Sequence, residues 1–187
     1  MGNFYTNVTT RGPLQEDLAV MLRELGRSAF LAPTTHGYTL ICDRECENQD
    51  TDVLASLALT VSTRLACPAW AVLNHDDDVL WYQLYDKGNL VDAYISSKEW
   101  WEDPEELPPQ GSPEILCRVM GNPGDLAKTK KILARSSGVI GYLFEIRRHE
   151  DLLEALGQPP FAAGLGYEYA SRGELTTGLV PGQLLLV

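Results

Sequence analysis

Cysteine and histidine are scarce in this 187-residue sequence, and their scarcity restricts its chemistry. The four cysteines are Cys42, Cys46, Cys67 and Cys117, and there are three histidines. Cys42 and Cys46 form a C-x3-C pair, but no second pair stands at a spacing that would complete a tetrahedral zinc site. We therefore expect reduced, buried thiols and no metal. No histidine has a nucleophile at a recognisable spacing, and the phosphate-binding pattern G-x-x-x-x-G-K-[ST] is absent, so we expect no cofactor.

Positive charge is also scarce: 15 Lys and Arg residues face 26 Asp and Glu residues, a formal net charge of −11. Such a surface repels phosphate backbones and anionic lipids, which argues against nucleic-acid and membrane partners. It attracts a basic protein or a cation, although excess acid also simply keeps a protein soluble. No stretch reaches the roughly 18 apolar residues of a spanning helix. Residues 1–6 do not match a secretory signal. These absences predict a cytoplasmic protein.

The first 95 residues alternate between strand-like and helix-like hydrophobic periods, and this alternation predicts the fold. The expected strands are residues 3–11, 27–33, 37–43 and 69–74, and the expected helices are residues 14–25 and 51–65. The resulting βαββαβ order is that of a ferredoxin-like α+β fold, in which two helices cover one face of an antiparallel sheet. Two further hairpin strands, residues 79–85 and 90–95, extend that sheet at one edge.

The remaining residues differ in character, so we divide the chain into three parts. These are a sheet domain (1–95), an acidic loop or linker containing prolines and tryptophans (96–113), and a mostly helical part (114–187) packed on the first. In the last part we expect helices at 114–120, 125–135 and 149–156, and strands at 139–146 and 161–169. The apolar tail, residues 184–187, either packs on the protein or meets a partner.

The linker contains the first group of candidate binding residues. Trp100 and Trp101 stand directly before Glu102 and Asp103. Two adjacent indoles are costly to leave in water, so they fold back over the sheet or form a contact surface for a partner. We favour folding back, because large exposed apolar patches are the rarer case.

The second group follows the strand at 69–74. His75 precedes Asp76, Asp77 and Asp78, and an imidazole with three carboxylates has the donor atoms of a hard-cation site. Successive residues on a strand point to opposite faces, however, and the spacing of an EF-hand is absent. Aspartates also favour hairpin turns. We therefore interpret these residues as a turn that presents carboxylates.

Four segments resemble an uncharacterised group of bacterial proteins. They are residues 1–9 (MGNFYTNVT), 74–85 (NHDDDVLWYQLY), 148–157 and 161–175, so the resemblance covers most of the chain. It implies a bacterial, cytoplasmic setting. The group brings no assigned activity, and no functional residue is carried over from it.

The leading hypothesis is a non-enzymatic protein that binds another, basic protein through acidic loops and an aromatic patch, in an immunity-like or regulatory role. Its expected contact residues are Asp76, Asp77, Asp78, Trp100, Trp101, Glu102 and Asp103. A module that binds a small molecule or a metal ion is the first alternative. A hydrolase whose site joins residues distant in the sequence is the second.

Overall fold

The computed structural model describes residues 2–100, 108–121 and 123–187. Its strands are β1 (Tyr5–Arg11), β2 (Ala29–Leu31), β3 (Tyr38–Asp43), β4 (Pro68–His75), β5 (Val79–Asp86), β6 (Asn89–Ile95) and β7 (Leu185–Leu186). The α-helices are α1 (Gln15–Glu24), α2 (Thr51–Arg64), α3 (Pro113–Met120), α4 (Leu126–Ala134), α5 (Glu145–Leu156) and α6 (Tyr167–Ser171). Short 3-10 turns are η1 (Glu45–Asn48), η2 (Lys98–Trp100) and η3 (Pro160–Ala162). The six strands expected in the first 95 residues are all present.

These strands form one antiparallel sheet in the order β6-β5-β4-β1-β3-β2-β7 within the described residues. The first strand lies at its centre, where Val8 pairs with Ala71 of β4 on one side and with Ile41 of β3 on the other. Tight hairpins add β5 and β6 beside β4, which confirms the expected extension at one edge. At the opposite edge β7 pairs with β2, so the apolar tail packs on the protein.

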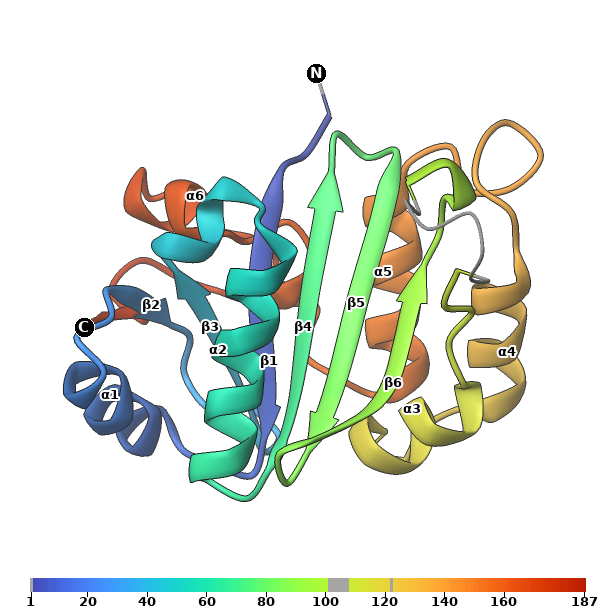
Figure 1. Cartoon of the computed structure of the whole chain (residues 1–187). Helices are drawn as coiled ribbons and strands as arrows, with labels where there is room; N and C mark the ends of the chain where they lie inside the picture. Colours follow the sequence, from blue (N-terminus) through green and yellow to red (C-terminus); the bar gives the residue numbers. More distant parts are fainter. Residues whose placement is uncertain (1, 101–107, 122) are drawn as a thin grey trace.

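Helices cover both faces of the sheet (Figure 1). Helices α1 and α2 pack on one face, as expected, and the C-terminal helices pack on the other. Successive side chains of β4 therefore enter different cores: Ala71 and Leu73 face α1 and α2, whereas Trp70 and Val72 face the C-terminal helices. Burial on both sides explains why this strand is a continuous apolar run instead of an alternating one.

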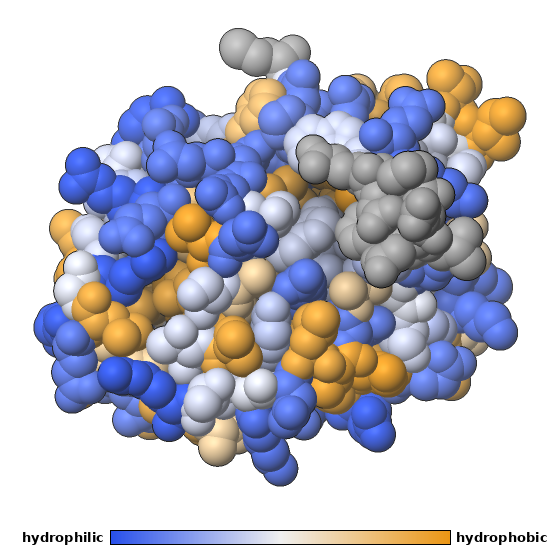
Figure 2. Space-filling view, viewed as in Figure 1, coloured by the Kyte–Doolittle hydropathy of each residue, from blue (hydrophilic) through white to orange (hydrophobic). Residues whose placement is uncertain are grey.

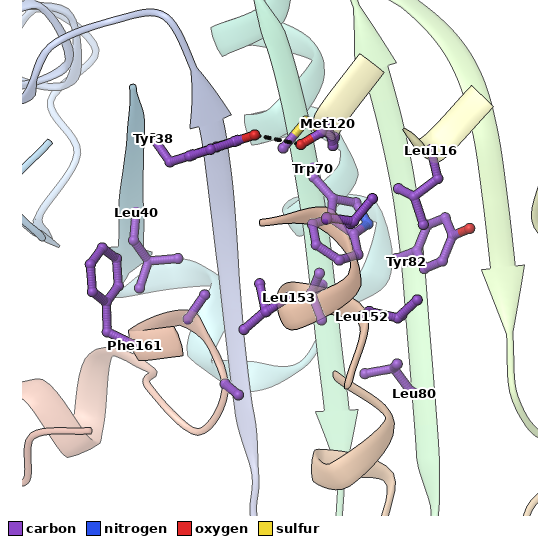
Figure 3. Packing of buried hydrophobic residues seen from close by; sticks show 14 of the residues in the cluster. Tyr38, Leu40, Trp70, Leu80, Tyr82, Leu116, Met120, Leu152, Leu153 and Phe161 are labelled. Atoms are coloured by element: carbon purple, nitrogen blue, oxygen red, sulfur yellow. Dashed lines mark hydrogen bonds between the residues drawn. The ribbon is translucent and has the colours of Figure 1, made fainter. Parts of the chain in front are cut away.

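The second core joins the first and last parts of the chain. In Figure 3 the side chains of Trp70 and Tyr82, from the sheet, lie among those of Leu116, Leu152 and Leu153, from α3 and α5. The hydroxyl of Tyr38 donates a 2.6 Å hydrogen bond to the carbonyl of Met120, at the end of α3. The helical part is thus docked directly on the sheet.

The helix ends carry the capping residues that the sequence indicates. The Asp50 carboxylate accepts hydrogen bonds from the first backbone N–H groups of α2, and Asp125 caps α4 in the same way. Gly157 ends α5 with a φ of 66°, in the left-handed region that favours glycine.

The strand expected at residues 139–146 is wrong. Residues 136–144, the 136–144 loop, close on themselves: the Gly138 N–H bonds the Tyr142 carbonyl at 2.7 Å, and the Tyr142 N–H bonds the Ser136 carbonyl at 2.9 Å. Backbone groups used inside the loop are not free to pair with a sheet. Helix α5 follows at Glu145, before its expected start at His149.

The strand expected at residues 161–169 is also wrong, since η3 and α6 stand there. Two carbonyl groups of this segment bond a side chain and not a neighbouring strand. The Asn7 amide donates to the carbonyls of Ala162 and Leu165 at 2.8 and 2.9 Å. Gly164 has a φ of 85°, far outside the range of a regular strand.

The linker is described in part. Residues 108–111 run beside β6, where the Ile95 N–H bonds the Pro109 carbonyl and the Gly111 N–H bonds the Ala93 carbonyl. Trp101, Glu102 and Asp103 lie outside the described residues. No helix in the described parts of the chain is long and apolar enough to cross a bilayer.

Candidate functional site

The β4–β5 turn is a tight hairpin. Asp76 and Asp77 have φ angles of 50° and 60°, and the Asp78 N–H bonds the His75 carbonyl at 2.9 Å. Two consecutive positive φ angles are typical of the two-residue turns that match the twist of paired strands. The expectation of a hairpin turn at residues 75–78 is therefore confirmed.

The three aspartates of this turn point to different partners. Asp77 is buried, and its carboxylate accepts hydrogen bonds from Asn3 and from the side chain of Asn74 at 2.8 to 3.1 Å. Asp76 accepts a bond from the Gly2 N–H at 2.9 Å, and Asp78 is exposed. No group of three or more His, Cys, Asp or Glu side chains that could hold a metal ion occurs among the described residues.

His75, at the end of β4, lies between two aromatic side chains. Its ring meets the Phe4 ring edge-on at 4.9 Å between centroids, and the Trp100 ring lies at 4.5 Å with a 54° tilt. Its Nδ1 lies 2.5 Å from Oε1 of Gln49, and the Gln49 amide in turn donates to the Asn74 carbonyl. Since an amide oxygen only accepts, this contact makes His75 Nδ1 the donor and fixes the ring in place.

These aromatic side chains are only half covered. Trp100 is 43% exposed and Phe4 is 39% exposed, even though each ring contacts that of His75. The indole of Trp100 thus folds back on His75 and still presents a face to solvent.

A hollow of about 430 Å³ opens beside this cluster, and we call it the aromatic hollow. Its walls include the rings of Phe4, His75, Trp100 and Tyr169 and the charged groups of Glu47, Glu168 and Arg172. Figure 1 shows that the chain start, the β4–β5 turn, η2 and α6 all lie toward the same end of the sheet. Phe4 and Tyr169 are also joined directly, because the Phe4 N–H donates to the Tyr169 hydroxyl at 3.4 Å.

The two carboxylates of the hollow are held differently. Glu47 is half-buried and accepts a 2.8 Å hydrogen bond from the Tyr167 N–H, at the start of α6. Burial raises the pKa of Glu47, and the backbone N–H groups of Tyr167 and Glu168 oppose that rise. Glu168 is exposed at the rim. A cation entering the hollow would meet aromatic rings and negative charge together, the combination that proteins use to bind ammonium and guanidinium groups.

Sequence reasoning found only part of this site. Trp100 is a wall of the hollow. Asp76 lies on the turn next to His75 but does not line the hollow, and its carboxylate accepts from the Gly2 N–H. Asp78 borders a different depression beside η2, and Asp77 faces inward. Phe4, Glu47, Glu168, Tyr169 and Arg172 were missed. They come from segments far apart in the chain, and no short spacing links them.

A second surface feature projects from the same end of the molecule (Figure 1). The 136–144 loop exposes Val139 and Ile140 at 92% and 94%. Its exit is attached to the β4–β5 turn, where the Glu145 N–H bonds the Asp77 carbonyl at 2.8 Å. Apolar side chains also reach the surface at the upper right of Figure 2. Two exposed apolar side chains at a loop tip form only a small patch, of a kind that is common on protein surfaces.

No family model, curated protein or solved structure matches this chain.

Proposed function

We propose that this protein is a non-enzymatic interaction module that binds an arginine- or lysine-bearing segment of a partner protein in the aromatic hollow. The observation that carries the proposal is a cluster of three rings, in which His75 contacts both Phe4 and Trp100. The carboxylates of Glu47 and Glu168 line the same hollow. Neutralisation of a basic protein, as by an immunity protein, is one form of this function.

The charges and rings act at different stages of binding. The net charge of −11 attracts a basic partner from a distance and raises the association rate, with an effect that salt screens. Inside the hollow, a cation on an aromatic face gains about 0.5–1 kcal/mol at an exposed site and about 2 kcal/mol when desolvated.

The scaffold proposed for this module is a ferredoxin-like core extended by a hairpin. Two observations support it: the element order β1-α1-β2-β3-α2-β4, and the neighbouring of β4, β1, β3 and β2 in that order in an antiparallel sheet. In this arrangement His75 stands at the end of a strand that is paired on both sides, so the rigid sheet positions its ring.

The enzymatic and metal-binding alternatives have less support in the described residues. The side chain of His75 is bonded to Gln49, and that of His149 is bonded to the hydroxyl of Tyr5 deep in the core. Cys42, Cys46 and Cys67 are buried. Burial raises the pKa of the Cys67 thiol to about 11, which disfavours the reactive thiolate.

Binding of a fluorescein-labelled peptide of alternating arginine and glycine, measured by anisotropy, tests the proposal. Trp100→Ala should weaken binding about tenfold or more, because an aromatic contact at the centre of an interface is worth about 2 kcal/mol. Glu168→Gln should weaken it by a smaller factor.

The matched control is Leu90→Ala, which truncates another half-exposed apolar residue on β6. It should leave binding unchanged. A second control peptide carries citrulline, a neutral analogue of arginine, and should bind far more weakly. Equal affinity for the two peptides, or full affinity in a folded Trp100→Ala variant, contradicts the proposed function.

A further inference from the structure

One wall of the aromatic hollow is itself a cation. The guanidinium carbon of Arg172 lies 5.3 Å from the centroid of the Tyr169 ring. Its Nη1 lies 3.8 Å from a carboxylate oxygen of Glu168, and its Nε lies 3.1 Å from Glu174. Within the hollow, a ring face and a rim carboxylate are therefore already engaged by an arginine of the same chain.

We propose that Arg172 is an intramolecular competitor, which occupies the ring of Tyr169 and the carboxylate of Glu168 until an arginine of the partner displaces it. This inference rests on the proposed function and adds two statements to it. The preferred ligand group is a guanidinium, and the free site is partly self-occupied. Guanidinium groups stack on aromatic faces and pair with carboxylates in a planar geometry that the ammonium group of lysine lacks.

The contacts of Arg172 are weak enough to be exchanged. Its side chain is about half exposed, and both of its acidic partners are more exposed still. Ion pairs at such sites contribute little because water screens them. The displaced guanidinium would remain hydrated, because the side chain is already half exposed.

The surface beneath Arg172 is held independently of it. The Glu47 carboxylate fixes the start of α6 through the Tyr167 N–H, and the Tyr169 hydroxyl accepts from the Phe4 N–H. Removal of Arg172 should therefore leave the ring of Tyr169 in position and uncovered.

The test compares Arg172→Ala with Arg147→Ala in the peptide-binding measurement. Arg147 is a suitable control because it is exposed, is paired with Glu150, and carries the same charge. If Arg172 competes for the site, Arg172→Ala should bind the arginine–glycine peptide about fivefold more tightly, as expected for freeing one exposed cation–π contact. Arg147→Ala should change affinity by less than about twofold, the general effect of one added negative charge.

The gain should be larger for the arginine peptide than for a lysine–glycine peptide of the same length. An unchanged or weakened affinity of Arg172→Ala overturns the inference, and so does an equal gain in Arg147→Ala. If the natural chain binds the peptide, Trp100→Ala loses that binding and Arg172→Ala shows no gain, the competitor role of Arg172 is rejected and the proposed function stands. Absence of binding in both the natural chain and Arg172→Ala rejects both.

Discussion

Arg148 is a fully buried cation beneath the 136–144 loop. Its Nε donates to Glu145 at 2.6 Å, and its Nη1 donates to the carbonyls of Ile132 and Arg135 at 2.7 and 2.8 Å. Its guanidinium carbon also lies 4.4 Å from the centroid of the Tyr142 ring. These contacts tie the end of α4, the loop and the start of α5 together. A buried charge pair of this kind is tolerated only when its hydrogen bonds are satisfied.

Replacement of Arg148 should consequently be severe. Arg148→Met leaves the Glu145 carboxylate buried without its cation and the Arg135 carbonyl without its guanidinium donor, so it should lower the free energy of unfolding by about 3–5 kcal/mol. Urea denaturation followed by circular dichroism measures this. Arg147→Met, at the exposed neighbouring position, should stay within about 0.5 kcal/mol of the natural chain. Similar losses in the two variants would contradict the role given to burial.

His149 should make stability depend on pH. Burial lowers its pKa to about 3, so between pH 6.5 and 3 the unfolded chain binds a proton at this position that the folded chain does not. The contribution of the neutral ring is therefore present above pH 6.5 and is lost as the pH falls, by about 1.4 kcal/mol per pH unit.

The measurement is the free energy of unfolding at several pH values from 7 to 4.5, in the natural chain and in His149→Phe. The aromatic replacement keeps a ring against Trp70. Its stability should fall less steeply than that of the natural chain, because the other titrating groups are common to both. Parallel curves would mean that His149 does not carry the effect.

At the scale of elements, the tip of the 136–144 loop is the clearest case of structure without packing. Val139 and Ile140 are almost fully exposed, so Val139→Ser combined with Ile140→Ser should change the free energy of unfolding by less than about 0.5 kcal/mol. Leu152→Ala, which empties a fully buried position on α5, should cost about 2–5 kcal/mol. Thermal denaturation of both variants checks this. A loss above about 1 kcal/mol in the loop variant would show that the tip is packed.

Elements whose signal is local could be predicted from the sequence. The apolar periodicity of α2, its Asp50 cap and the glycine that ends α5 each depend on neighbours within a few residues. The errors have a different origin. Residues 139–146 have the apolar, β-branched character of a strand, but the loop satisfies its own backbone groups. Residues 161–169 give two carbonyls to Asn7, a partner that no local pattern indicates.

Only those residues of the candidate site could be predicted whose type alone indicates a contact. A tryptophan in a polar linker signals a contact, and Trp100 does lie in the cluster. The identity of its neighbours depends on topology, since Phe4, His75 and Tyr169 meet only after the sheet and α6 have formed. The three consecutive aspartates of the β4–β5 turn could not be told apart in the sequence. In the structure Asp77 is buried and the other two are exposed, because the turn points each side chain in a different direction.

At the scale of the whole molecule, the sheet is closed at one edge by a pairing between β2 and β7, which are separated by most of the chain. Bringing such distant segments together costs loop-closure entropy, so this pairing is expected late in folding. Until then the outer edge of β2 offers free backbone donors and acceptors to any strand nearby. The two-residue strand that completes the native sheet therefore also covers this edge. While it is unpaired, concentrated refolding chains can pair with one another there.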